Sequence, residues 1–307
     1  MKIAIIGCGA MGSVYAALLA DAGNEVWAID TWQEHVDAIN TAGLRVEGTS
    51  GDRTVQLKAS INASDAGECE LIIVATKASG VAAAAQSAKS IAGPESVILT
   101  IQNGLGAADR IAEAIDTSQV MIGVVGGFGA SMKGPGHAHH NGMQLVRIGE
   151  MEGGISKRLN DVVAAWTGAG FTAKGYPDIH QMIWEKFICN VTYSGPCALM
   201  NATIGQVQVN PQAWSVALAC AKEADAVARA KNIALGFEDV ERYVREFGAN
   251  MPDARPSMLL DHMASRPSEI DGINGAVPVE AEKIGMTAPV NEVVANLVRG
   301  REASFSG

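Results

Sequence analysis

The first half of the chain alternates short apolar runs with helical patterns. The runs are mostly apolar, as in strands buried on both faces of a sheet, and they cover residues 3–6, 25–29, 70–75, 97–101 and 120–125. The helical patterns between them cover residues 13–22, 32–41, 81–91 and 105–115. Strands that alternate with helices in this way predict an α/β fold with a doubly wound parallel sheet.

Further elements are predicted around and after this sheet. They are a strand pair at 44–47 and 54–59, an antiparallel strand at 143–148, a helix at 155–167 and a last strand at 171–175. Residues 126–142 are rich in glycine and predict an exposed loop. This loop contains His137, His139 and His140, but no carboxylate or cysteine accompanies them at the spacing of metal ligands, so we expect no metal site.

Only helical patterns follow residue 178. They cover residues 179–195, 211–231, 237–248, 257–264, 268–284 and 289–301. Gly195-Pro196 is expected to end the first of these helices, because proline lacks the N–H that the next turn needs. Tyr176-Pro177-Asp178 is the predicted linker. We therefore expect an N-terminal doubly wound α/β domain at residues 1–177 and an all-helical domain at residues 178–307.

The composition restricts the classes of partner. With 307 residues and 48% hydrophobic side chains, the chain can form two domains with sizeable cores. The formal charge of −10 argues against nonspecific binding to nucleic acid or to an anionic membrane. No apolar stretch is long enough to span a bilayer. The five cysteines are widely spaced without a CxxC pair, so we expect reduced thiols in a cytoplasm.

A glycine motif joins the first strand to the first helix. The sequence GCGAMG at 7–12 is a G-x-G-x-x-G at the point where a Rossmann fold binds a pyrophosphate. Gly7 allows a tight turn, Gly9 lets the backbone approach the phosphates, and Gly12 lets helix and strand pack closely. The three glycines, together with Ala10 and Met11, place the helix N-terminus and its free N–H groups at the phosphates. The motif predicts a dinucleotide-binding domain.

Asp30 ends the second strand, eighteen residues after Gly12, where an acid accepts hydrogen bonds from ribose hydroxyls. A carboxylate there repels a ribose 2′-phosphate and no arginine stands beside it, so NAD is favoured over NADP. Lys77 and Asn103 follow two other strands of the predicted sheet. Ligands gather beyond such strand ends, so each residue is either a ligand contact or an ordinary loop residue.

The first helix of the second domain carries a polar stripe. Lys186, Asn190 and Ser194 are spaced i, i+4 and i+8, so they share one face of the helix among apolar neighbours. A cation with an amide beside it can hold a carboxylate and a carbonyl. The alternative is that this stripe is a solvated face.

Two polar residues further along have open roles. Ser257 either lines a site or caps its helix. Glu269 follows Ser268 at a predicted helix start, and Ser268 with Asp271 has the form of a capping box. Spacing alone therefore favours Glu269 as a first-turn helix acid over a catalytic group.

Together these residues resemble the ketopantoate reductase (2-dehydropantoate 2-reductase) family. The motifs are GCGAMG at 7–12, ATKA at 75–78, QNG at 102–104, KGPG at 133–136, WEKFICN at 184–190, and SML and SEIDGINGA between 257 and 276. They cover nearly the whole chain in the family's order. The resemblance implies a Rossmann domain that holds a nicotinamide cofactor and an all-helical domain that closes the cleft.

The resemblance also implies roles for single residues. The lysine that matches Lys186 acts as general acid, and the glutamate that matches Glu269 assists it. The asparagines that match Asn103 and Asn190 and the serine that matches Ser257 contact the substrate or the nicotinamide. For Glu269, the resemblance favours a catalytic role over that of a helix-start acid.

Three positions depart from the family's pattern. Asp30 stands where the family usually has an arginine that binds NADPH, so we expect NAD(H), while the resemblance leaves NADP(H) open. Ser194 and Ala254 stand where substrate-binding asparagines are usual, and Ser194 remains a candidate substrate contact. The family is similar, in fold and catalytic pair, to NAD-dependent D-2-hydroxyacid dehydrogenases of the D-mandelate type, which Asp30 favours.

We therefore expect a cytoplasmic oxidoreductase that transfers a hydride from a nicotinamide cofactor to a 2-keto acid, a reaction that the resemblance connects with pantothenate biosynthesis. Lys186 would protonate the developing alkoxide and Glu269 would orient the ammonium group. One alternative is a D-2-hydroxyacid dehydrogenase that works mainly in the oxidative direction. Another, of a different class, is a non-catalytic NAD-binding sensor. A homodimer is left open as the assembly.

Overall fold

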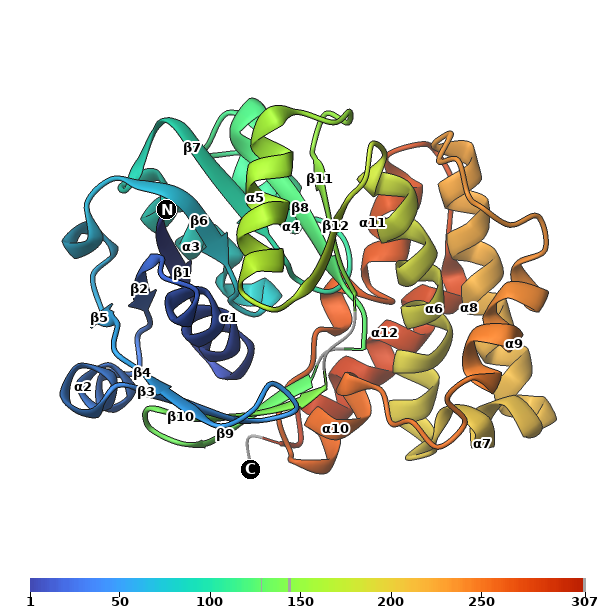
Figure 1. Ribbon diagram of the computed structural model, residues 1–307. Coiled ribbons are helices and arrows are strands. Elements are labelled where there is room, and N and C mark those ends of the chain that lie inside the picture. Colours follow the sequence, from blue (N-terminus) through green and yellow to red (C-terminus); the bar gives the residue numbers. More distant parts are fainter. Residues whose placement is uncertain (128, 143–144, 306–307) are drawn as a thin grey trace. The chain divides into compact units, whose positions relative to one another are not determined.

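The computed structural model describes residues 1–127, 129–142 and 145–305, which form two compact units (Figure 1). The first unit contains residues 1–102 and 107–179, and the second contains residues 103–106 and the chain from His180 onward. The four residues 103–106 belong to the second unit although they lie within the sequence of the first. Each unit is built around hydrophobic cores of its own.

The first unit contains an eight-stranded sheet in the order β12-β11-β8-β7-β6-β1-β2-β5. Its strands are β1 (Lys2–Ile6), β2 (Glu25–Ile29), β5 (Lys58–Ser60), β6 (Cys69–Val74), β7 (Ala92–Thr100), β8 (Val120–Val125), β11 (Leu145–Glu150) and β12 (Thr172–Gly175). Neighbours pair in parallel except β8 and β11, which are antiparallel. The alternation at 143–148 predicted this antiparallel strand, and positions 143 and 144 of that prediction lie outside the described residues.

Side chains of the central strands alternate between two cores. In β1, Ile3 and Ile5 enter one core, whereas Ala4 and Ile6 enter the other. The helices that contribute to the first core are α1 (Ala10–Asp21), α2 (Gln33–Ala42) and α5 (Lys157–Gly168), and those that contribute to the second are α3 (Val81–Lys89) and α4 (Ala107–Ala112). Helices thus cover both faces of a mostly parallel sheet, which confirms the predicted doubly wound α/β fold.

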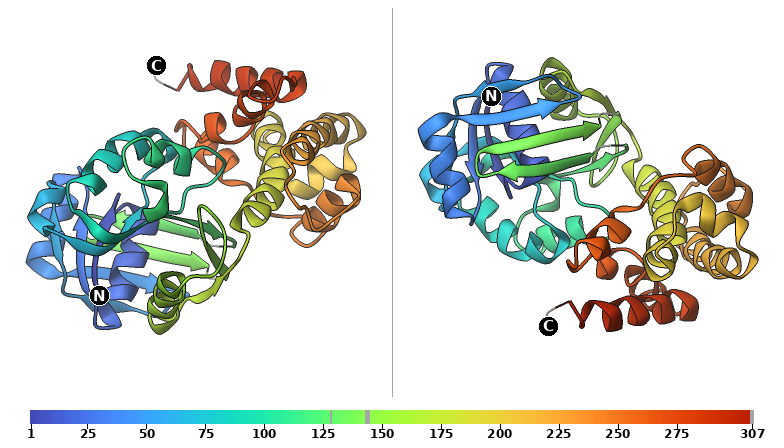
Figure 2. Two further views of the ribbon diagram at one scale, coloured as in Figure 1. Left: turned by 90° about the horizontal axis from the view of Figure 1, so that it is seen from above. Right: turned by 90° about the horizontal axis from the view of Figure 1, so that it is seen from below.

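A second, four-stranded sheet lies in the first unit, in the order β4-β3-β10-β9 (Figure 2, right). Its strands are β3 (Leu44–Gly48), β4 (Arg53–Val55), β9 (Gly129–Gly134) and β10 (His137–Gly142). The prediction of an exposed loop at 126–142 is therefore wrong, because β9 and β10 form an antiparallel hairpin and β10 pairs in parallel with β3. Residue 128 lies outside the described residues. The pattern was hard to recognise because His140, a polar residue, occupies a fully buried position.

The predicted strand at 54–59 is also wrong in extent. The segment forms two short strands that belong to different sheets, since β4 pairs with β3 and β5 pairs with β2. Between the two sheets lies α1, which packs on β1 and β2 and also on β3, β9 and β10. Residues 12–19 of this helix are all buried. Its alanine-rich sequence, apolar on every side, is what a helix enclosed by two sheets requires.

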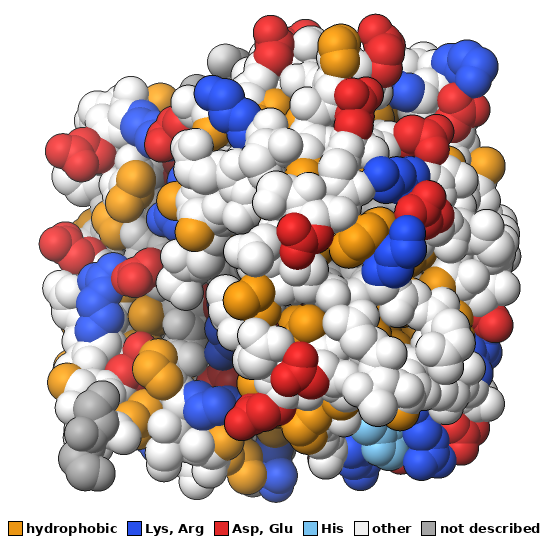
Figure 3. All heavy atoms as spheres, turned by 90° about the vertical axis from the view of Figure 1, so that its left-hand side faces the viewer, with side chains coloured by type: hydrophobic (Ala, Val, Ile, Leu, Met, Phe, Trp, Pro, Cys, Tyr) orange, Lys and Arg blue, Asp and Glu red, His pale blue; other side chains and the backbone are white. Residues whose placement is uncertain are grey.

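The second unit is helical, as predicted. Its helices are α6 (Ile179–Met200), α7 (Ile204–Val209), α8 (Pro211–Ala230), α9 (Val240–Ala249), α10 (Ser257–Met263), α11 (Ala276–Glu282) and α12 (Pro289–Glu302). No helix in the described ranges is sufficiently long and apolar to cross a membrane. On the face of the molecule shown in Figure 3, acidic and basic side chains are interspersed, so positive charge is not concentrated there.

The expected end of the first helix at Gly195-Pro196 is wrong, because α6 continues through Pro196 to Met200. Close packing accounts for this. A Cβ on Gly195 would lie 2.5 Å from Cγ1 of Val294 and 2.8 Å from Oδ1 of Asn274, so glycine allows α12 and Asn274 to approach α6. Asn274 also donates from Nδ2 to the carbonyl of Val191 at 2.9 Å. Tertiary contacts thus hold a helix that local propensity would end.

The predicted helix at 268–284 is divided in two. A single 3₁₀ turn, η4 (Ile270–Gly272), is followed by α11. Glu269 is the N-cap of η4, and no side chain caps this turn within the described residues. The capping box proposed for Ser268 and Asp271 is therefore wrong. The Ser268 hydroxyl bonds instead to Glu302, a residue too distant in the sequence for a local pattern to indicate.

Candidate active site

The three glycines of the 7–12 motif have different surroundings. Gly7 has φ +91°, and a Cβ there would lie 2.6 Å from the backbone nitrogen of Thr76. A Cβ on Gly12 would lie 2.2 Å from the carbonyl oxygen of Gly7. A Cβ on Gly9 would meet nothing within 4 Å. Gly7 and Gly12 are thus required by the fold, whereas Gly9 keeps the backbone open to an incoming ligand.

The N-terminus of α1 fits a dinucleotide pyrophosphate. Gly9 is the N-cap, and Ala10 and Met11 are the first helical residues. Among the described residues no side chain caps this helix, and its first turn contains no acid. The N–H groups of the first turn have no partner inside the helix, so they are donors suited to phosphate oxygens.

Asp30 follows β2 directly, as the sequence predicted. Its Oδ1 accepts a hydrogen bond from the backbone N–H of Trp32 at 2.9 Å, which orients the carboxylate at the strand end. The indole of Trp32 stacks on the ring of His35 with a centroid distance of 5.2 Å. Lys77, the other charged candidate of this unit, is exposed and immediately precedes the 3₁₀ turn η2 (Ala78–Gly80).

A buried relay, which sequence analysis missed, holds the glycine motif. The backbone N–H of Gly136 donates to Nδ1 of His35 at 2.9 Å, and Nε2 of His35 lies 3.3 Å from Oγ of Ser13. Ser13 donates to the carbonyl of Cys8 at 3.0 Å. Since Nδ1 accepts, we assign the ring proton to Nε2, so that every donor has an acceptor. Burial lowers the pKa of His35, which favours this neutral form.

Gln102 holds two strand ends together. Its Nε2 donates to the carbonyls of Val74 at 2.8 Å and Thr76 at 3.0 Å, and its Oε1 accepts from the N–H of Ile101 at 3.2 Å. The side chain therefore links the ends of β6 and β7. In the sequence, Gln102 stands out only as part of the motif QNG at 102–104. Its position after a buried strand was the available signal.

Within the second unit, Asn103 joins Lys186 to Glu269. Lys186 donates from Nζ to Oδ1 of Asn103 at 2.8 Å, and Asn103 donates from Nδ2 to Oε2 of Glu269 at 3.4 Å. All three side chains are partly buried. The amide thus presents its oxygen to a cation and its N–H to an anion, which is the only orientation that satisfies both.

The backbone around Asn103 is fixed tightly. Gly104 has φ +83°, and a Cβ there would lie 1.9 Å from the carbonyl oxygen of Gly272, so this position requires glycine. The next residue, Leu105, donates its N–H to the same oxygen at 3.0 Å. The turn at 103–106 is therefore attached to η4, the turn that Glu269 begins.

The other predicted substrate contacts have different environments. Asn190 and Ser194 follow Lys186 at successive turns of α6, and they are half-buried and 4% exposed, respectively. Ser257 is exposed at the first turn of α10. The N-cap of that helix is Pro256, so the reading of Ser257 as a helix cap is wrong.

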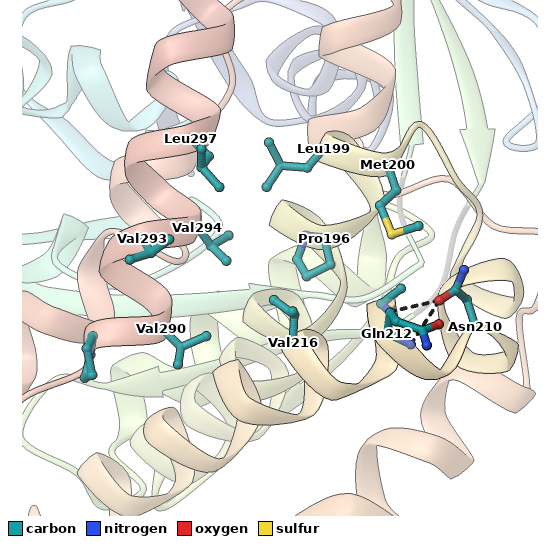
Figure 4. Close-up of a pocket in the computed structure, with 12 residues that line it drawn as sticks. Pro196, Leu199, Met200, Asn210, Gln212, Val216, Val290, Val293, Val294 and Leu297 are labelled. Atoms are coloured by element: carbon teal, nitrogen blue, oxygen red, sulfur yellow. Dashed lines mark hydrogen bonds between the residues drawn. The ribbon is translucent and has the colours of Figure 1, made fainter.

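An apolar cavity of about 660 Å³ also lies in the second unit (Figure 4). Its walls come from the C-terminal part of α6, the start of α8, and α12. None of its lining residues is titratable. Its Asn210 is used as a helix cap, since Oδ1 accepts from the N–H groups of Gln212 and Ala213 at 3.0 Å. The cavity therefore offers no acid–base group for catalysis.

The histidines of β10 lie close to side chains of β3 and of the turn that follows β3. Glu47 lies 3.2 Å from Nε2 of His137 and 3.4 Å from Nδ1 of His139, and Nδ1 of His140 lies 3.0 Å from Oγ of Ser50. Over residues 1–127, 129–142 and 145–305, no three or more His, Cys, Asp or Glu side chains are grouped to hold a metal ion.

Both halves of the sequence match one family. Residues 3–153 match the family described as ketopantoate reductase PanE/ApbA, and residues 178–302 match its C-terminal part. The chain belongs to the ketopantoate reductase family. The resemblance drawn from the motifs is thereby confirmed, and so is the prediction of a nicotinamide-dependent oxidoreductase of the ketopantoate reductase type.

Individual members of the ketopantoate reductase family are similar over almost their full length. The 2-dehydropantoate 2-reductase of Streptococcus pyogenes serotype M3 is 31% identical over 304 residues, which cover 99% of this chain and 98% of the relative. That of Archaeoglobus fulgidus is 30% identical over 305 residues, with 99% of each covered.

Among solved structures, the ketopantoate reductase from Ralstonia eutropha JMP134 is similar with a TM-score of 0.90 at 30% identity, and each chain is fully covered. A D-mandelate dehydrogenase, solved with NADH and anilino(oxo)acetate, is similar with a TM-score of 0.90 at 27% identity, with 100% of this chain and 99% of the other covered. The fold is thus shared by a ketopantoate reductase and by a D-mandelate dehydrogenase.

Proposed function

We propose that this protein reduces a 2-keto acid to the 2-hydroxy acid, with Lys186 as general acid. The observation that carries the proposal is the hydrogen bond from Lys186 Nζ to Asn103, which itself donates to Glu269. An ammonium group on a partly buried helix face, linked through an amide to a carboxylate, is suited to give a proton and to stabilise negative charge.

In the proposed mechanism the residues of the second unit act on the keto oxygen. A bound nicotinamide supplies the hydride that reduces the carbonyl carbon. Lys186 donates its proton to the oxygen as alkoxide charge develops there. Glu269 acts on Lys186 through Asn103, which holds the ammonium group in one orientation. Asn190 and Ser194, on the same face of α6, together with Ser257, are the proposed contacts for the polar groups of the substrate.

The proposed cofactor is NADH. The N-terminus of α1 would hold the pyrophosphate through Gly9, Ala10 and Met11, and Asp30 would accept hydrogen bonds from the ribose hydroxyls. The carboxylate of Asp30 disfavours the 2′-phosphate of NADPH. Lys77 remains a proposed contact for the cofactor.

A D-2-hydroxyacid is the second candidate substrate, in the reverse direction. Two observations favour it: Asp30 in place of the family's arginine, and the likeness to a D-mandelate dehydrogenase solved with NADH. A cytoplasmic location remains a proposal and is supported by five cysteines that are all buried and unpaired.

The test is a panel of 2-keto acids, ketopantoate included, assayed with NADH and with NADPH, and a matching panel of D-2-hydroxy acids with NAD⁺. We expect turnover of at least one 2-keto acid, and Lys186→Ala should lower its kcat by about 10²–10⁴-fold while NADH binding is retained. Lys186→Arg should restore little, because a guanidinium does not readily release its proton.

Each contrary result identifies a different error. Turnover that survives in Lys186→Ala would contradict the assignment of the general acid. Turnover of hydroxy acids alone would favour the second candidate. Cofactor binding without turnover of any substrate in either panel would contradict the proposed reaction.

A further inference from the structure

The last turn of α12 binds the chain on both sides of Glu269. On one side, Oε1 of Glu302 accepts hydrogen bonds from the N–H of Ser268 at 2.9 Å and from its hydroxyl at 2.5 Å. On the other side, Arg299 donates from Nε and Nη2 to Oδ1 of Asp271 at 2.9 and 2.6 Å. Arg299 and Glu302 are three residues apart and so share one face of the helix.

We propose that Glu302 is a positioning residue for Glu269, with Arg299 as a weaker second support. The proposal rests on the proposed function, because it requires Glu269 to assist Lys186. We call the pair Glu302 and Arg299 the α12 clamp. Glu302 does not touch the reacting groups. It holds Ser268 in place and thereby fixes the position of Glu269, the next residue in the chain.

The carboxylate of Glu302 is largely buried and has several hydrogen-bond partners. Its side chain is 12% exposed, and the same Oε1 also lies 3.0 Å from Nε2 of His262, whose side chain is fully buried. The ring of Phe305 packs edge-on against His262 at 5.1 Å. A carboxylate so enclosed is costly without donors, and three donors on one oxygen stabilise it in this position. The Arg299–Asp271 pair is much more exposed and contributes less.

Glu269 has little local support of its own. It begins a single 3₁₀ turn without a side-chain cap among the described residues, and such short turns have poor hydrogen-bond geometry. Its contact with Asn103 is 3.4 Å long, near the limit for a hydrogen bond. A small displacement of the turn would therefore separate Glu269 from Asn103. The backbone bond from Leu105 to Gly272 holds the far end of the turn, and the side chains of α12 hold the residues directly beside Glu269.

The experiment compares Glu302→Ala with Glu302→Gln, using the 2-keto acid that gives the highest turnover. Glu302→Ala should lower kcat by about 10- to 100-fold, as expected for the misplacement of a catalytic group. The KM for NADH should not change, since the glycine motif lies in the first unit. Glu302→Gln keeps an oxygen acceptor and should recover most of kcat. Glu292→Gln, an exposed acid on the same helix, is the control and should match the native enzyme.

A second set of measurements separates positioning from stability. In a Glu269→Gln background, Glu302→Ala should lower kcat by less than twofold, because the two losses share one cause. Equal fold losses in both backgrounds, or a Glu302→Ala enzyme with a lower melting temperature and native kcat, would overturn the proposal. If Glu302→Ala does not fold, Ser268→Ala removes one of the two donors and should give a smaller loss of kcat, again only when Glu269 is present. A native kcat in Ser268→Ala would overturn it as well.

Failure of the α12 clamp can be told from failure of the proposed function. A Glu269→Gln enzyme with native kcat would overturn the role of Glu269 and the clamp with it. A Glu269→Gln enzyme with low kcat, beside a fully active Glu302→Ala enzyme, would overturn the clamp alone.

Discussion

At the scale of single residues, Asn103 has the greatest influence on the site. Its place after a strand makes it a candidate ligand contact, and the family resemblance implies that it contacts the substrate or the nicotinamide. Its contacts with Lys186 and Glu269 join residues that are 83 and 166 positions away in the sequence. No local pattern carries that information. We therefore expect Glu269 to orient the ammonium group of Lys186 through Asn103.

Asp30 is the residue from which we predict cofactor preference. The native enzyme should show a higher kcat/KM with NADH than with NADPH. Asp30→Ala should narrow that ratio by about tenfold, which corresponds to about 1.4 kcal/mol of removed repulsion between a carboxylate and a phosphate. Steady-state kinetics with both cofactors on the native and variant enzymes give the ratio.

The matched control for this prediction is Asp37→Asn, which removes an exposed acid from α2. It should leave the ratio unchanged, because Asp37 is engaged with Gln33 on the helix surface. A native enzyme that prefers NADPH, or an Asp30→Ala enzyme with an unchanged ratio, would contradict the assignment.

At the scale of elements, the sequence predicted helices and strands correctly where the pattern of apolar residues matches the burial in the structure. The strands around the glycine motif lie where continuous apolar runs placed them, because a parallel sheet covered on both faces requires such runs. The predictions failed where distant packing decided the conformation. The small sheet depends on pairing between β3 and β10, and α6 continues past Pro196 because Asn274 and α12 pack against it.

Gly195 provides a test of that packing. Gly195→Ala should lower the free energy of unfolding by about 1–3 kcal/mol, because the new Cβ has no space between Val294 and Asn274. Gly300→Ala is the matched control, since Gly300 is also helical and a Cβ there meets nothing within 4 Å. It should raise the free energy of unfolding by about 0.5–1 kcal/mol, because alanine is the better helix former. Urea unfolding of the variants measures both, and a Gly195→Ala protein as stable as the native one would refute the packing argument.

At the scale of the whole molecule, two buried histidines link stability to pH. Burial lowers the pKa of His35 and of His140 below the ordinary value of 6.5. Below that value the unfolded chain binds more protons than the folded one, so the free energy of unfolding falls as the pH drops from 7 toward the lower pKa of the folded state. The neutral form of His35 is also the one that accepts the hydrogen bond from Gly136.

The corresponding prediction compares the native protein with His35→Gln between pH 7 and pH 5. The variant should be less stable at pH 7, because the relay to Ser13 is changed, and its stability should decline less steeply with acidification. His140 and the carboxylates are common to both proteins, so the difference in slope belongs to His35. Two parallel stability curves, measured by urea unfolding at each pH, would contradict the prediction.

The turn at 103–106 has a consequence for how such enzymes can be recombined. It is encoded inside the gene segment for the first unit, yet it belongs to the helical unit. A single crossover near residue 178, which would exchange the helical halves of two relatives, therefore leaves Asn103 behind and sets Lys186 and Glu269 against a turn from the other parent. A chimaera designed to exchange substrate preference must therefore also replace the four codons for residues 103–106. Asn103, Lys186 and Glu269 then come from the same parent.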